Sequence, residues 1–168
     1  MDPREQIAQL YVEARDDVFR YLVAMGVSSA QAQDLAQESF LRLYERLAEG
    51  VRIQEPRAWL FRVAHNLAWN ARAREWAFEP FDESVHAAPQ QPDSGVEDGV
   101  IGRERMARVA RAVASLSPQQ KQVLEMRASG LRYREIAATL DIGISTVFEF
   151  VTRAVARLRR AASGEADE

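Results

Sequence analysis

Apolar residues recur at every third or fourth position along most of the chain, and this spacing predicts α-helices. Proline, serine and glycine residues stand at the ends of the apolar stretches, as is typical of helix boundaries. Three helices are predicted in the N-terminal part, bounded by Asp2-Pro3 and Gly26, by the capping-box pair Ser28-Gln31 and Gly50, and by Pro56 and Trp76. We expect these helices to share one apolar core.

A second group of helices follows a segment of different composition. Residues 77–99 contain three prolines with Gln, Ser and Gly residues and no basic residue, which is typical of a linker. Further helices are predicted over about 100–115, between Ser117-Pro118 and Gly130, and on either side of Asp141-Ile142-Gly143. The predicted fold class is all-α, with two small helical modules (1–76 and 100–162), a flexible linker (77–99) and a short acidic tail (163–168).

The charges are unevenly distributed along the 168 residues. The whole chain carries a net charge of −3, a balance that by itself argues against a nucleic-acid partner. Residues 1–74 are neutral, residues 75–102 carry −7, and residues 103–162 carry +7. Of the 22 basic residues only Lys121 is a lysine, and arginine suits bidentate contacts with phosphates and bases. The second module is therefore a candidate for nucleic-acid binding.

Composition also excludes several classes of site. The chain has no cysteine and two histidines, so disulfides, thiolate metal sites and cysteine nucleophiles are excluded, and neither a metal nor a cofactor is expected. No apolar run approaches the roughly 18 residues needed to span a membrane, so we expect a soluble cytoplasmic protein without membrane insertion. Gly-rich phosphate loops and nucleophile elbows are absent, and we expect no catalytic residue and no enzyme activity.

Residues 133–152 match a helix-turn-helix pattern. Ala137 is small where the two helices would cross, Asp141 stands at the turn and can adopt left-handed geometry, and Ser145 is placed to cap the second helix. The second helix has one apolar stripe and an opposite polar face, which a recognition helix would present to the major groove. The buried stripe is predicted to be Val147, Val151, Ala154, Val155 and Leu158, and the outer face Ser145, Thr146, Glu149, Thr152, Arg153 and Arg160.

Two interpretations of this outer face remain open at this point: it reads DNA, or it is a charged face exposed to solvent. The predicted cap, the turn, the apolar stripe and the positive charge of the module favour DNA reading. Glu149 would repel phosphates unless it accepts a hydrogen bond from a cytosine amino group. Phe148 is placed where it could touch a thymine methyl, whereas Phe150 is predicted to join the core.

The third predicted helix combines aromatic and basic residues on one face. Opposite its apolar stripe lie Phe61, Arg62, His65, Trp69 and Arg72. Rings that stack on exposed bases and arginines that meet phosphates are typical of a single-strand surface. In the alternative interpretation, Trp69 and Phe61 pack beneath Phe78 and Phe81 of the linker.

Taken together, four stretches make the chain resemble an extracytoplasmic-function (ECF, group IV) RNA polymerase sigma factor. The stretch from Asp34 to Tyr44 (DLAQESFLRLY) resembles the part of region 2 that docks on polymerase. The stretch from Pro56 to Ala68 (PRAWLFRVAHNLA) resembles the part that melts and reads the minus-ten element. LSPQQKQVL (116–124) and YREIA (133–137) resemble region 4, which reads the minus-thirty-five element.

The resemblance implies a promoter-specificity factor whose partners are core RNA polymerase, promoter DNA and an anti-sigma factor, and a monomeric state is expected. It implies polymerase contacts for Asp34, Gln37, Glu38 and Arg42. Single-strand minus-ten contacts are implied for Arg62, His65, Asn66, Trp69, Asn70 and Arg72, beside a base-trapping loop, Glu49–Glu55. Minus-thirty-five contacts are expected for Arg132, Arg134, Ser145, Thr146, Phe148, Glu149, Arg153 and Arg157. The acidic linker would thread the polymerase cleft, where its charge could mimic RNA.

Two alternatives remain beside the sigma factor. A stand-alone helix-turn-helix regulator would explain the second module but leave the first without a role. An interaction protein that has lost DNA binding is the other, because family members often carry Lys, Arg or His where Phe148-Glu149-Phe150 stands.

Overall fold

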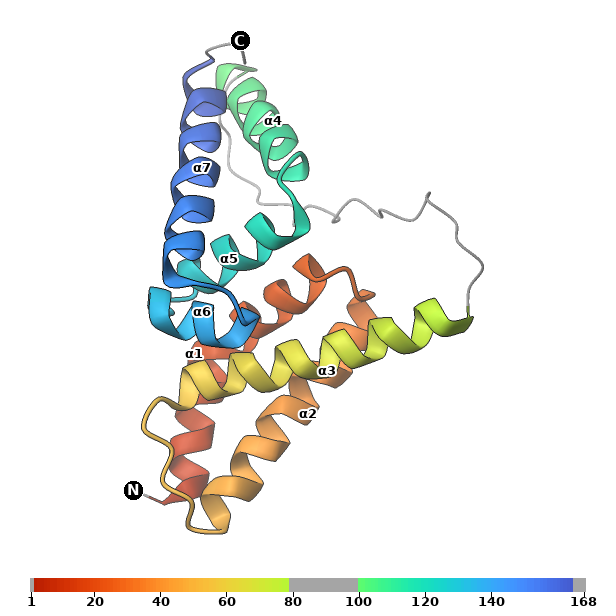
Figure 1. The fold of residues 1–168 in the computed structure, drawn as a ribbon, viewed down its shortest axis with the longest axis vertical. Helices are drawn as coiled ribbons and strands as arrows, with labels where there is room; N and C mark the ends of the chain where they lie inside the picture. Colours follow the sequence, from red (N-terminus) through yellow and green to blue (C-terminus); the bar gives the residue numbers. More distant parts are fainter. Residues whose placement is uncertain (1, 79–99, 165–168) are drawn as a thin grey trace.

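The computed structural model describes residues 2–78 and 100–164, and over these residues the chain forms seven α-helices and no strand (Figure 1). The helices are α1 (Pro3–Ala24), α2 (Ser29–Ala48), α3 (Pro56–Phe78), α4 (Val100–Ala114), α5 (Pro118–Ala128), α6 (Tyr133–Leu140) and α7 (Ile144–Ser163). The all-α prediction is thus confirmed. From residue 79 onward the predicted linker lies outside the described residues, as do residues 165–168 of the predicted tail.

Helices α1, α2 and α3 form the first module. The side chain of Asp2 caps α1 by accepting a hydrogen bond from the Arg4 amide at 3.1 Å. The predicted capping box of α2 is present, since the Ser28 amide donates to the Gln31 side chain at 3.1 Å and the Gln31 amide donates to the Ser28 hydroxyl at 3.3 Å. Such caps satisfy amides that have no partner inside the helix.

The apolar faces of these three helices meet in one core, as predicted. Its largest fully buried side chains are Tyr21, Leu22, Met25, Leu43, Leu60 and Phe61. Full burial of a large apolar side chain contributes roughly 1.5–3 kcal/mol. Helix α3 lies across the module, and its C-terminal turns extend past α1 and α2 (Figure 1). This long helix therefore offers an exposed surface on a rigid base.

Helices α4 to α7 form the second module. Helix α7 packs along α4 and also against α5 and α6 (Figure 1). A capping box of Ser117 and Gln120 begins α5, and Arg108 of α4 donates to the Ala161 carbonyl of α7 at 3.0 Å. These contacts hold the helix-turn-helix pair α6–α7 on a helical base.

The two modules also pack against each other. Helix α5 contacts α1, and α6 contacts α3 (Figure 1). Val123, Met126 and Leu131 of the second module belong to the same continuous apolar cluster as Val18 and Leu22 of the first. The sequence patterns describe each module separately and gave no indication of this association.

Candidate nucleic-acid and polymerase interfaces

The exposed face of α3 carries an aromatic platform, which we define as Trp69 and His65. The Trp69 side chain is 58% exposed, and its ring stacks on the His65 imidazole with 6.3 Å between centroids and an interplanar angle of 23°. The hydroxyl of the buried Tyr21 is hydrogen bonded to His65 Nδ1 at 2.7 Å and fixes the imidazole from the side of the core. Burial lowers the pKa of His65, so the imidazole is neutral at physiological pH.

Polar side chains surround this platform. Arg62, Asn66 and Asn70 are all exposed on α3, as the sequence analysis predicted. An arginine and two amides beside a flat ring combine a phosphate-binding charge, donors and acceptors for base edges, and a stacking surface. The arrangement suits an unpaired strand with exposed bases.

Two other residues that the sequence placed on this face are engaged elsewhere. Phe61 was assigned to the polar face, and that assignment is wrong: Phe61 is fully buried, with its ring 5.5 Å from that of Tyr21. Arg72 is half-buried and donates to the Met25 carbonyl at the C-terminal end of α1. Its guanidinium thus has a structural contact, and its DNA contact stays a prediction. Phe81, the other ring invoked in the alternative packing, lies outside the described residues.

The helix-turn-helix forms as predicted, with one correction at its second helix. Asp141 adopts left-handed geometry (φ 54°, ψ 46°) between α6 and α7. The predicted cap Ser145 is instead an exposed residue inside the helix, because α7 begins at Ile144 and Gly143 is the N-cap. The Gly143 carbonyl accepts the first intrahelical hydrogen bond, from the Val147 amide at 3.1 Å. The Ser145 hydroxyl therefore makes no capping hydrogen bond and faces outward.

The outer face of α7 is partly apolar. Phe148 is 57% exposed and Ile144, one turn earlier, is 54% exposed. The Phe148 ring meets Tyr133 of α6 edge to face at 6.1 Å. Of the predicted buried stripe of α7, Val147 and Ala154 are fully buried, and the other three members, Val151, Val155 and Leu158, are half-buried. The sequence analysis had singled out Phe148 but not Ile144, which extends the apolar part of the face.

Charged and polar side chains complete this outer face. Glu149 forms an ion pair with Arg153 one turn later, so the carboxylate that would repel phosphates is partly neutralised. Ser145 is exposed and Thr146 half-buried. Arg153 is also exposed, whereas Arg157 is half-buried.

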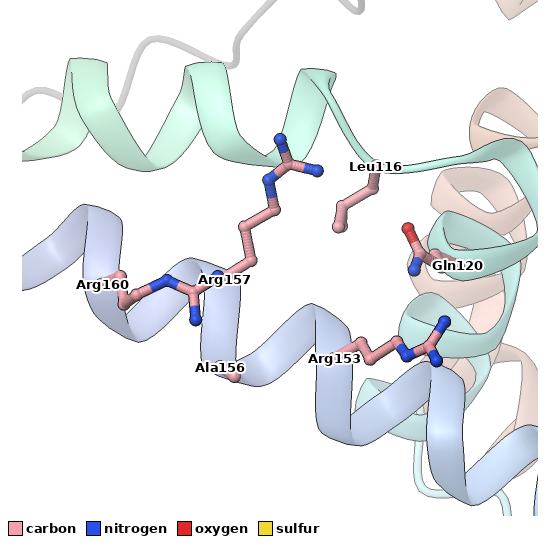
Figure 2. Close-up of a pocket in the computed structure, with 6 residues that line it drawn as sticks. All are labelled: Leu116, Gln120, Arg153, Ala156, Arg157 and Arg160. Carbon is pink, nitrogen blue, oxygen red and sulfur yellow. The ribbon is translucent and has the colours of Figure 1, made fainter. Parts of the chain in front are cut away.

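An arginine-lined cavity of about 430 Å³ lies beside the C-terminal half of α7 (Figure 2). Figure 2 shows Arg157 pointing toward the end of α4 and Arg153 pointing toward Gln120 at the start of α5. Arg157 Nη1 also donates to the Ser115 carbonyl at 3.5 Å. The lining residues are Leu116, Gln120, Arg153, Ala156, Arg157 and Arg160. Leu116 and Gln120 lie in the stretch 116–124 that resembles region 4, but the sequence analysis assigned them no contact of their own.

The exposed face of α2 presents the residues predicted to contact polymerase. Asp34, Gln37 and Arg42 are exposed, and Arg42 pairs with the half-buried Glu38 at 2.7 Å. Leu41, which the sequence analysis did not single out, is 51% exposed beside them. An apolar centre with a charged rim is the usual composition of a protein–protein interface.

The two arginines expected to lead the helix-turn-helix toward DNA lie beside the first module. Arg132 and Arg134 are exposed, and their guanidinium nitrogens lie 3.3 and 4.0 Å from a carboxylate oxygen of Glu55. Glu55 belongs to the loop before α3. The structure brings these sequence-distant residues together, and no local pattern indicated that it would.

These features define a two-module helical protein with an exposed aromatic platform on one module and a helix-turn-helix on the other. Within residues 2–78 and 100–164, no group of three or more His, Cys, Asp or Glu residues could hold a metal ion. The same part of the chain contains no helix that is long and apolar enough to cross a membrane.

Comparison with known proteins identifies the family. Residues 10–78 match the profile of Sigma-70 region 2, and residues 106–158 match that of Sigma-70, region 4. The ECF RNA polymerase sigma factor SigL of Mycobacterium tuberculosis is 30% identical over 154 residues, which cover 89% of this chain and 85% of SigL. SigE of Mycolicibacterium smegmatis is 28% identical over 90% of this chain but only 59% of its own length.

Solved structures show the same fold. The sigma factor RpoE of Bartonella quintana, in complex with the anti-sigma factor NepR, is 22% identical and matches with a TM-score of 0.66 over 96% of this chain and 99% of RpoE. CnrH, in complex with the cytosolic domain of CnrY, matches with a TM-score of 0.56 at 21% identity, over 97% of this chain and 91% of CnrH. The chain belongs to the ECF RNA polymerase sigma factor family, and we refer to its modules as region 2 and region 4.

Proposed function

We propose that the chain binds core RNA polymerase through α2, opens the minus-ten element with α3, and reads the minus-thirty-five element with α7. The observation that carries the proposal is the pairing of a fixed aromatic platform on region 2 with a helix-turn-helix on region 4, in one chain that matches both sigma regions. A stand-alone helix-turn-helix regulator is not favoured, because it would leave region 2 without a role.

On region 2, the chemistry of strand opening is stacking. Moving a base out of the duplex stack costs a few kcal/mol of free energy. Stacking of that base on an aromatic ring is favourable by about 1–3 kcal/mol and offsets part of this cost. The exposed Trp69 offers such a surface, and His65 beneath it keeps the indole in place. Arg62 beside the platform is available to a phosphate of the same strand.

On region 4, the chemistry is duplex reading. The exposed Phe148 and Ile144 are suited to thymine methyl groups, while the Glu149–Arg153 pair offers an acceptor and a donor to base edges. The arginine-lined cavity beside α7 lies where positive charge would hold the phosphate backbone.

The chain acts by binding, without a chemical step of its own, in the cytoplasm where transcription occurs. We further propose an anti-sigma factor as its regulator, since the similar RpoE was solved with one. The exposed α2 surface around Leu41 is a candidate face for such a partner, because a protein bound there would compete with polymerase.

In vitro transcription with purified core RNA polymerase and a promoter library tests the proposal. Initiation at a shared two-element sequence is the expected result. Failure to bind core polymerase would overturn it, and tight sequence-specific duplex binding by the free protein, without polymerase, would support the stand-alone regulator instead.

A further inference from the structure

The first two turns of α7 carry no basic residue. From Ile144 to Thr152 the chain has neither lysine nor arginine, and the first basic residue of the helix, Arg153, is ion-paired with Glu149. Proteins gain most of their affinity for DNA from cations that bind phosphates, whereas base edges are read by short-range contacts in the groove. In the proposed function this end of α7 therefore selects bases and adds little to the overall affinity.

The Phe148 side chain is exposed and yet held in place. Its exposed fraction is 57%, and its ring meets the ring of Tyr133 edge to face at 6.1 Å. The guanidinium of Arg127 in turn lies over the Tyr133 ring, 5.5 Å from the centroid. A side chain that is already ordered loses little conformational entropy when it contacts a ligand. Phe148 is therefore a preorganised apolar contact on the outer face of the helix.

Glu149, the next residue, adds a hydrogen-bond acceptor to the same part of the face. Its side chain is 51% exposed, and its ion pair with Arg153 reduces the repulsion between the carboxylate and nearby phosphates. A glutamate in the major groove accepts a hydrogen bond from the N4 amino group of cytosine. Thymine presents the acceptor O4 at this place and offers the carboxylate no donor. Glu149 therefore favours a pyrimidine with an amino group at C4.

The two side chains come from consecutive positions and can meet on one base. Consecutive residues of an α-helix are separated by a rise of only about 1.5 Å. On a pyrimidine, the groups at C4 and C5 stand on adjacent ring atoms of the major-groove edge. The Phe148 ring favours a methyl group at C5, which cytosine lacks, and the Glu149 carboxylate favours an amino group at C4, which thymine lacks. A cytosine that carries a C5-methyl group satisfies both side chains.

We infer that Phe148 and Glu149 form a reading site for 5-methylcytosine in the minus-thirty-five element. The C5-methyl group contacts the Phe148 ring, and the N4 amino group donates a hydrogen bond to the Glu149 carboxylate. Promoter choice by this chain then depends on whether a cytosine of the upstream element is methylated. The inference rests on the proposed function in one respect, the placement of α7 in the major groove, and not on the polymerase contacts or on strand opening.

Cytosine, 5-methylcytosine, uracil and thymine differ only at C4 and C5, so they separate the two contacts. Holoenzyme made from the full-length chain and core polymerase is bound in competition to a library-selected promoter, in which each pyrimidine of the minus-thirty-five element is replaced in turn. At one position, 5-methylcytosine should bind about fourfold more tightly than cytosine, the effect of burying one methyl-sized group. It should bind at least about fivefold more tightly than thymine, the lower end for a specific base-edge contact.

Variants assign each preference to one side chain. Phe148→Ala should make cytosine and 5-methylcytosine bind equally and keep the preference for 5-methylcytosine over thymine. Glu149→Ala should remove the preference over thymine and keep the preference over cytosine; because this variant also releases Arg153 to bind phosphates, ratios between bases are compared instead of single affinities. Met106→Ala removes an apolar side chain of α4 that is 62% exposed, and this control should leave both ratios unchanged.

Equal binding of cytosine and 5-methylcytosine at every position, or a methyl preference that survives in Phe148→Ala, would overturn the inference. Tighter binding of thymine than of 5-methylcytosine would also overturn it, by showing that Phe148 reads a thymine methyl group without Glu149. If holoenzyme initiates transcription but methylation has no effect, only the inference fails. If the chain does not bind core polymerase, the proposed function fails, and the same replacements in duplexes selected by the free chain decide the inference. Absence of any selective duplex binding would overturn both.

Discussion

Replacement of Trp69 by alanine tests the aromatic platform most directly. Because 58% of the Trp69 side chain is exposed and its ring stacks on that of His65, outside the buried core, the substitution should leave the core of region 2 intact. Loss of one base-stacking contact costs about 1–3 kcal/mol. At room temperature this corresponds to an open-complex equilibrium about 5- to 150-fold less favourable.

Open-complex formation can be followed with a fluorescent probe in the minus-ten element, using holoenzyme on matched promoters. On a promoter whose minus-ten element is already unpaired by mismatches, the unpairing cost is absent and the variant should recover much of its activity. Trp69→Tyr keeps a stacking ring and serves as the conservative control. Equal loss on duplex and pre-melted promoters, or unchanged opening in Trp69→Ala, would refute the stacking role.

Three further predictions follow from single side chains. Phe61→Ala should lower the free energy of unfolding by about 3–5 kcal/mol in urea titrations, because the ring is fully buried against Tyr21; a loss below 1 kcal/mol would contradict that burial. Phe148→Ser should abolish any preference for thymine over uracil in the minus-thirty-five element, because the exposed ring is the proposed contact of the thymine methyl group. Transcription from promoters with uracil at single positions measures this preference, and an unchanged preference would exclude Phe148 as the methyl contact. Since burial raises the pKa of the Glu125 carboxyl above its ordinary value of 4.5, the folded protein binds this proton more readily than the unfolded chain. The contribution of Glu125 to the free energy of unfolding should therefore be lost as pH rises from 4.5 through the raised pKa, and urea titrations of Glu125→Gln should lack this part of the pH dependence; an unchanged pH dependence would contradict the burial of the carboxyl.

Much of the fold could be predicted because its signals are local. Capping boxes at Ser28 and Ser117 depend on residues three positions apart, and the apolar stripe of α7 depends on neighbours one turn away. The left-handed turn at Asp141 is likewise decided by a single residue between two apolar stretches. Such features are already encoded in a short window of sequence.

The errors occur where a distant segment determines the environment. Phe61 follows the buried Leu60 and would face solvent on an isolated amphipathic helix, but α1 supplies Tyr21 to cover it. Arg72 is drawn away from solvent by the carbonyl at the end of α1, which periodicity within α3 cannot reveal. The contact of Glu55 with Arg132 joins charges that are 77 positions apart, so only the docked modules bring them together.

The aromatic platform of Trp69 and His65 is uncharged, and this has a consequence for the salt dependence of promoter binding. Binding through arginines releases counterions and weakens steeply as salt rises, whereas stacking on uncharged rings releases none. Because burial lowers the pKa of His65, its imidazole is uncharged and adds nothing to this salt-dependent binding. In a salt titration of the promoter complex, the upstream duplex held by region 4 should therefore be released first, while the melted strand on the platform stays bound to higher salt. Footprinting at each salt concentration would measure the order of release, and the reverse order would show that charge, rather than stacking, holds the melted strand.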